Sequence, residues 1–199
     1  MAEPFFNILN HFSIQFYINK IQCRSVTFGA FSCNSKGGYE CNFIRGVEVL
    51  PKAKQFVHDL DIRLIADILS EALKKLEIGN YYNGYLGVDM FLCEHQNGRL
   101  FLHPCVEINL RQNMGLVAHY LSSWIADNRV GRFRIINKTN VSNNDIMGFI
   151  NSNSPQWSKS KLQSGLIALT PPVNRNHVAI AEICNVKNNE NVLIFNDII

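Results

Sequence analysis

The sequence predicts an α+β protein in which an antiparallel β-sheet is flanked by helices. Residues 13–33 are rich in β-branched and aromatic side chains with partial alternation, which is typical of strands. Residues 52–78 carry apolar side chains at helical spacing. Asn97-Gly98 lies between two apolar runs and is the strongest short signal for a β-hairpin. The chain has 199 residues, 47% of them hydrophobic, so it can bury a substantial core.

The first elements expected along the chain are strands. Residues 13–33 predict two strands, because side chains such as Ile14, Phe16 and Val26 fit a pleated, half-buried surface. Residues 34–38 (Asn-Ser-Lys-Gly-Gly) have the composition of a turn or a mobile loop. Residues 39–44 are expected to resume a strand.

A helix is expected within residues 52–78, and its apolar face is predicted to cover the core. Asp61 lies near its start and Lys74 near its end, as the helix dipole favours. Gly79 is placed to end it. The residues at helical spacing are Leu60, Leu64, Ile65, Ile68, Leu69, Ala72, Leu73 and Leu76.

The hairpin and a second helix follow. Residues 84–94 and 99–110 are expected to form two strands joined around Gln96-Asn97-Gly98. A helix is expected over residues 114–126, with Asn113 as its N-cap. One face of this helix would carry Val117, Tyr120, Leu121 and Trp124.

The composition changes after residue 126, where Asn, Ser and Lys become frequent. Strands are expected only at residues 166–170, 178–184 and 192–195. We therefore predict a first domain over residues 1–130 and a small α/β appendage over residues 131–199.

The bulk properties exclude several classes of protein. The net charge is +3 and the basic residues are scattered, whereas a nucleic-acid binder shows a concentrated basic face. No apolar run approaches the roughly 18 residues that a membrane-spanning helix needs. The first residues carry an acid and no apolar segment follows, so a cytoplasmic location is expected, without nucleic-acid or membrane partners.

Three polar side chains interrupt the apolar runs of the predicted hairpin. Asp89 lies in the middle of one strand, and Glu107 and Asn109, two residues apart, share a face of the other. A bulge of one residue near Pro104 would place Asp89 opposite Glu107. Two adjacent carboxylates on a half-buried sheet are costly without a cation between them, and Mg²⁺ prefers such oxygen ligands.

An anion site is predicted beside this metal site. Arg111 follows two residues after Asn109, and the free N–H groups of the next helix would face the same region. Taken singly, each residue is more often structural or solvated. Taken together in an apolar hairpin, these residues predict a site for Mg²⁺ and phosphate.

A zinc-binding structural module is an alternative. Cys93 and His95 on one strand, and His103 and Cys105 on the other, would face each other across the hairpin. Their spacing matches no common zinc module.

Residues 84–91, 97–98 and 104–115 resemble the metal-binding hairpin of the ATP-grasp superfamily. In that family an Asp, and a Glu-x-Asn after the turn, hold two Mg²⁺ ions that bridge the phosphates of ATP. The resemblance implies that Asp89, Glu107 and Asn109 are the metal ligands. A weaker resemblance covers residues 3–38. It assigns Glu3 to the acidic hinge that contacts the nucleoside, and the mobile loop that follows contains Lys36, which would close over phosphate.

The resemblance implies the C-terminal subdomain of an ATP-grasp fold. If Glu3 is the hinge residue, the lobe that precedes it in the family is missing from this sequence. The chain would then be a fragment, a truncated gene product, or a split subunit whose partner chain supplies that lobe. Pro104, which interrupts the second strand, and a longer hairpin are departures from the family.

The implied function is that of a carboxylate–amine ligase. Such enzymes use ATP and Mg²⁺ to convert a small carboxylate into an acylphosphate, which an amine then attacks. Arg111 would be the catalytic residue that stabilises phosphoryl or acylphosphate oxygens. The alternatives are a non-catalytic ATP-grasp remnant or partner subunit, and the zinc module.

Overall fold

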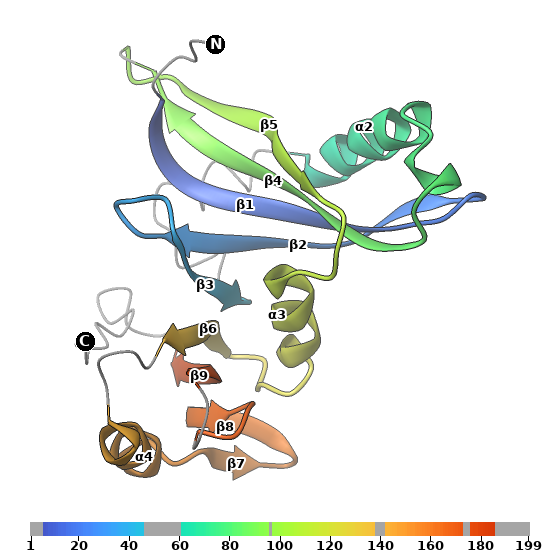
Figure 1. Ribbon diagram of the computed structural model, residues 1–199. Helices are drawn as coiled ribbons and strands as arrows, with labels where there is room; N and C mark the ends of the chain where they lie inside the picture. The colour runs from blue at the N-terminus through green and yellow to red at the C-terminus, as the bar shows by residue number, and fades with distance from the viewer. Residues whose placement is uncertain (1–5, 46–60, 96, 138–141, 173–175, 186–199) are drawn as a thin grey trace.

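The protein is one continuous antiparallel sheet with helices against it. The structure, a computed structural model, describes residues 6–45, 61–95, 97–137, 142–172 and 176–185. Nine strands follow the order β5-β4-β1-β2-β3-β6-β9-β8-β7, and the ladders between neighbouring strands are antiparallel. Figure 1 shows α2, α3 and α4 lying along this sheet. The predicted α+β class is confirmed.

The first half of the sheet is built around one central strand, β1. It pairs with β2 on one side and with β4 on the other. The predicted strands are confirmed, although the first two begin and end differently from the expectation. The bounds are β1 Asn7–Ile18, β2 Cys23–Cys33, β3 Tyr39–Ile44, β4 Gly84–Glu94 and β5 Leu100–Asn109.

One face of this half carries the larger hydrophobic core. Phe12, Phe16 and Val88 are almost fully buried there, and α2 contributes Leu69 and Leu73 to the same cluster. Successive strand residues point to opposite faces, so the residues between these positions, including Asp89, lie on the other face. Packing of α2 on the first face leaves the second face for the site.

Helix α2 (Ile62–Lys75) forms the described part of the helix expected over residues 52–78; residues 52–60 lie outside the described part. The side chain of Asp61 accepts hydrogen bonds from the backbone N–H groups of Arg63 and Leu64, at 3.0 and 3.1 Å. The expected role of Gly79 is corrected. Glu77 takes the left-handed conformation (φ 54°) after the helix, and a short 3₁₀ turn, Ile78–Asn80, follows. Gly79 allows close approach, because a Cβ there would lie 2.3 Å from the carbonyl oxygen of Asn19.

The second half of the sheet extends directly from the first. Strand β3 pairs with β6, so the sheet is continuous across residue 130. β8 and β9 correspond to two expected strands, whereas β6, α4 and β7 were not predicted; residues 192–195 lie outside the described part. The division at residue 130 stays a prediction. The bounds are β6 Arg129–Asn137, α4 Asn143–Ser152, β7 Gln156–Ser158, β8 Lys161–Ala168 and β9 His177–Asn185.

Helix α3 (Met114–Ser122) lies at the junction of the two halves (Figure 1). Its Ala118 packs in a second cluster with Ile44 of β3 and Phe133 of β6. The predicted N-cap is confirmed: Asn113 Oδ1 accepts from the N–H groups of Gly115 and Leu116, at 3.1 and 3.3 Å. The helix ends at Ser122, earlier than expected. In the described part of the chain, no helix has both the length and the apolar character needed to cross a membrane.

Candidate functional site

The hairpin of β4 and β5 places two carboxylates side by side. Asp89 pairs directly with Glu107, so both side chains leave the same face of the sheet. The register depends on a bulge: residues 104–106 of β5 lie opposite the single residue Met90 of β4. The predicted bulge near Pro104 is therefore present, but it has two extra residues instead of one.

The size of the bulge follows from the turn. The N–H of His95 donates to the carbonyl of Arg99 at 2.9 Å, and Gly98 takes the left-handed conformation (φ 78°). With His95 opposite Arg99, the two strands are offset by one residue from the register that a turn of Asn97 and Gly98 alone would give. The larger bulge compensates for it and restores the predicted pairing of Asp89 with Glu107.

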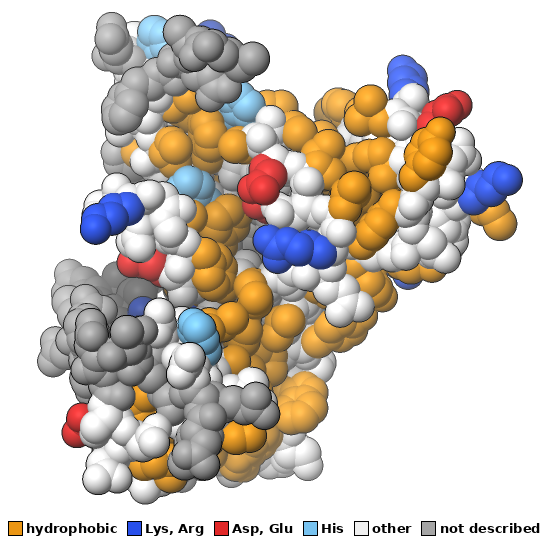
Figure 2. Space-filling view, viewed as in Figure 1, with side chains coloured by type: hydrophobic (Ala, Val, Ile, Leu, Met, Phe, Trp, Pro, Cys, Tyr) orange, Lys and Arg blue, Asp and Glu red, His pale blue; other side chains and the backbone are white. Residues whose placement is uncertain are grey.

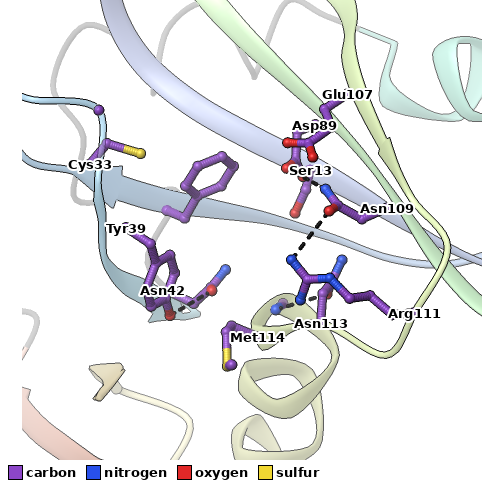
Figure 3. A pocket seen from close by; sticks show the side chains of 13 residues that line it. Ser13, Cys33, Tyr39, Asn42, Asp89, Glu107, Asn109, Arg111, Asn113 and Met114 are labelled. Atoms are coloured by element: carbon purple, nitrogen blue, oxygen red, sulfur yellow. Dashed lines mark hydrogen bonds between the residues drawn. The ribbon is translucent and has the colours of Figure 1, made fainter. Parts of the chain in front are cut away.

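A chain of side-chain hydrogen bonds runs from Asp89 to Arg111, whose guanidinium lies beside the start of α3 (Figure 3). Asn109 Nδ2 donates to Asp89 Oδ2 at 2.9 Å. Arg111 Nη2 donates to Asn109 Oδ1 at 3.2 Å. The structure thus brings together Asp89, Glu107, Asn109 and Arg111, as the sequence predicted; their roles as ligands and catalyst stay predictions.

The electrostatics of the pair favour a bound cation. Burial, and secondly the charge of Glu107, raise the pKa of Asp89 to about 6, although Arg111 and the hydrogen bond from Asn109 oppose the shift. Two carboxylates this close repel each other, and a cation between them would remove the repulsion. Two carboxylates and an amide oxygen are hard donors of the kind that Mg²⁺ takes, so this donor set fits the ion once the Asn109 amide turns its oxygen from Arg111 toward Asp89.

Two glycines let α3 approach the sheet beside the carboxylates. A Cβ on Gly87 would lie 2.0 Å from Asn113 Nδ2, and one on Gly115 would lie 2.6 Å from Gln15 Nε2. Gln15 is buried and donates from Nε2 to Ser13 Oγ at 2.8 Å. Sequence reasoning missed Ser13 and Gln15. The available signal was two polar residues alternating with the apolar residues of β1.

These residues form one side of a pocket of about 340 Å³. Side chains from β2 and β3 form the opposite wall (Figure 3). Figure 2 shows acidic and basic side chains meeting on this face among hydrophobic ones. The lining residues are Ser13, Phe31, Cys33, Gly37, Tyr39, Asn42, Asp89, Glu107, Asn109, Arg111, Asn113, Met114 and Gly115.

Glu3 and Lys36 are the two residues expected to contact the nucleotide. Glu3 lies outside the described residues. Lys36 is exposed in the loop between β2 and β3, and of that loop Gly37 lines the pocket. Nucleotide binding by either residue stays a prediction.

The zinc alternative is wrong for this hairpin. The His103 ring packs on Phe91, with 4.9 Å between ring centroids, while Cys93 is fully buried and Cys105 is exposed in the bulge. Within the described ranges, which contain all four candidate residues, no three His, Cys, Asp or Glu side chains are placed to hold a metal. The register pairs Cys93 with Phe101 and His103 with Phe91, and Cys105 lies in the bulge, so the four side chains do not converge.

No protein-family model matches the chain, and no curated protein is a significant match. Solved structures are similar. N5-carboxyaminoimidazole synthetase from Staphylococcus aureus, complexed with ADP, has a TM-score of 0.50 at 11% identity, over 92% of this chain and 48% of that chain. For biotin carboxylase from Campylobacter jejuni the TM-score is 0.43 at 11% identity, over 92% and 43%. For L-amino acid ligase from Bacillus licheniformis it is 0.40 at 10% identity, over 89% and 50%. The chain spans about half the length of these proteins.

Proposed function

Because the fold is that of about half of an ATP-grasp enzyme, we propose that this chain is the Mg- and ATP-phosphate-binding half of a ligase. The observation that carries the proposal is the direct pairing of Asp89 with Glu107, with Asn109 and Arg111 hydrogen-bonded beside them. The ligase would activate a small carboxylate as an acylphosphate for attack by an amine.

Asp89, Glu107 and Asn109 would hold Mg²⁺ through their side-chain oxygens. The bound ion would neutralise charge on the phosphoryl group that is transferred. Its binding would also relieve the repulsion that raises the pKa of Asp89.

Arg111 is the proposed catalytic residue. A carboxylate oxygen of the substrate would attack the γ-phosphorus of ATP, and the bond to the β,γ-bridging oxygen would break to release ADP. The amine would then attack the acyl carbon, lose a proton and expel phosphate. Arg111, held by Asn109 in front of α3, would stabilise the negative oxygens of both steps.

The rest of the nucleotide pocket is proposed to come from a separate lobe, on the same polypeptide or on a partner chain. The structural relative from Staphylococcus aureus is about twice as long as the part that this chain matches. Glu3 and Lys36 are the proposed contacts of this chain with the nucleoside and the phosphates.

The proposal is tested by calorimetric titration of the full chain with Mg-ATP. Glu107→Gln removes one charge from the site with little change of shape, and is expected to abolish binding. Glu71→Gln is the matched control, because Glu71 is exposed on α2 and pairs with Lys74. Equal binding by the parent and Glu107→Gln contradicts the proposed site. Binding by the parent without ADP formation, after the second lobe is added, identifies the non-catalytic alternative.

A further inference from the structure

The wall of the pocket opposite the carboxylates carries one buried amide, that of Asn42. Asn42 is 3% exposed on β3. The hydroxyl of Tyr39 donates to Asn42 Oδ1 at 2.9 Å, whereas its other acceptor, the carbonyl of Phe133, is 3.4 Å away. Burial raises the pKa of Tyr39, so the phenol keeps its proton and remains a donor. The oxygen of Asn42 is therefore occupied by Tyr39.

The nitrogen of the same amide faces the pocket. Figure 3 shows Asn42 Nδ2 turned away from Tyr39, toward the space between β3 and the carboxylates. An amide nitrogen can only donate hydrogen bonds. This wall thus offers a ligand a buried, neutral donor, with its orientation set by Tyr39.

The other side chains that line the pocket also favour a neutral acceptor of the ligand near Asn42. Among the described residues that line the pocket, the acids are Asp89 and Glu107, which the proposed function assigns to metal. Phe31, which pairs with Asn42 across β2 and β3, and Met114 of α3 add apolar side chains to the same lining. An ammonium group of a ligand at this wall would face the N–H groups of Asn42, so two donors would meet without an acceptor between them. Burying polar groups that have no hydrogen-bond partner is costly.

Resting on the proposed function, we infer that the substrate is an acid with a neutral oxygen acceptor beside its carboxylate, such as a 2-oxo acid. Arg111 would bind the carboxylate, and Asn42 Nδ2 would donate to the neighbouring oxygen. Asn42 is then the residue that distinguishes an oxo acid from an amino acid of the same size.

The test uses three-carbon acids that differ at one substituent: pyruvate, propanoate and L-alanine. The full chain is titrated without nucleotide, and binding is followed by NMR through the side-chain amide signal of Asn42. Pyruvate is expected to bind roughly three- to tenfold more tightly than propanoate, the value of one hydrogen bond, and L-alanine most weakly.

Two variants separate specificity from folding. Asn42→Asp keeps an oxygen for Tyr39 and replaces only the donor that faces the pocket, so L-alanine should now bind more tightly than pyruvate. Arg111→Ala should weaken all three acids together. These variants are followed through the backbone amide signals of β3.

Equal binding of the three acids by the parent, no binding of any of them, or an unchanged order in Asn42→Asp overturns the inference. The proposed function fails by a different result, namely equal Mg-ATP binding by the parent and Glu107→Gln. The two failures are therefore distinguishable, because the acid titrations contain neither metal nor nucleotide.

Discussion

At the scale of single residues, the site is defined by a carboxyl group in an unfavourable place. Asp89 is partly buried, lies opposite Glu107, and has a pKa raised to about 6. Arg111 and Asn109 only partly offset this. This arrangement, next to a pocket lined by Arg111 and Asn42, supports the proposal that the site takes a cation and an anionic ligand together.

The first prediction concerns the pH dependence of metal binding. A proton and a divalent cation compete for Asp89, whose pKa is about 6. Apparent affinity for Mg²⁺ is expected to be constant above about pH 7 and to fall by up to tenfold per pH unit below pH 6. Calorimetry across this range measures it. An affinity that is flat down to pH 5 contradicts a role for Asp89.

The same group predicts how stability changes with pH in the absence of metal. The folded-state pKa is above the ordinary aspartate value of 3.8, so between about pH 6 and pH 4 the folded protein binds a proton that the unfolded chain does not. The contribution of Asp89 to stability therefore rises as the pH falls through this window. Urea denaturation of the parent and of Asp89→Asn should show this slope only in the parent.

At the scale of elements, the turn and the bulge of the hairpin place Glu107 of β5 beside Asp89 of β4. Gly87 and Gly115 then let α3 approach the sheet next to these carboxylates. The sequence predicted the hairpin and the N-cap, because Asn97-Gly98 and Asn113 act locally. It did not predict β6. Arg132 and Arg134 interrupt its pattern, and their partner Glu182 is 50 and 48 residues away. Long-range pairing of this kind leaves no local signal.

A glycine prediction tests the close approach of α3. Gly87→Ala would place a methyl group 2.0 Å from Asn113 Nδ2, so the Asn113 side chain has to shift and its capping of α3 is disturbed. We expect a loss of about 1 to 3 kcal/mol and weaker Mg-ATP binding. Gly29→Ala is the control, because Gly29 lies on β2 of the same sheet and no atom lies within 4 Å of the added carbon. Urea denaturation measures both, and equal effects contradict the packing account.

At the scale of the whole molecule, one sheet carries two hydrophobic halves, and α3 packs where they meet. The second half is joined to β3 through β6, which pairs along its length with β9. Across these two strands, the fully buried carboxylate of Glu182 accepts from Arg132 Nε at 2.5 Å and from Arg134 Nη2 at 3.1 Å. This cluster fixes the part of the sheet on which α3 rests.

Removing the buried carboxylate of Glu182 should therefore lower the free energy of unfolding of the whole protein. Glu182→Ala leaves two arginines facing each other, and we expect a loss of about 3 kcal/mol in the free energy of unfolding. Asp127→Ala breaks the pair with Arg45, in which the Asp127 side chain is almost fully exposed, and should leave stability unchanged. Similar denaturation midpoints for the two variants contradict this role of Glu182.

We propose that Asp89, Glu107 and Asn109 share one divalent cation. Mn²⁺, which takes the same oxygen ligands as Mg²⁺, broadens NMR signals of nearby nuclei. Adding Mn²⁺ with ATP to the full chain should broaden the signals of these three residues and of Arg111 first, and Glu107→Gln should abolish the effect. Broadening centred elsewhere, or unchanged in Glu107→Gln, would contradict the account.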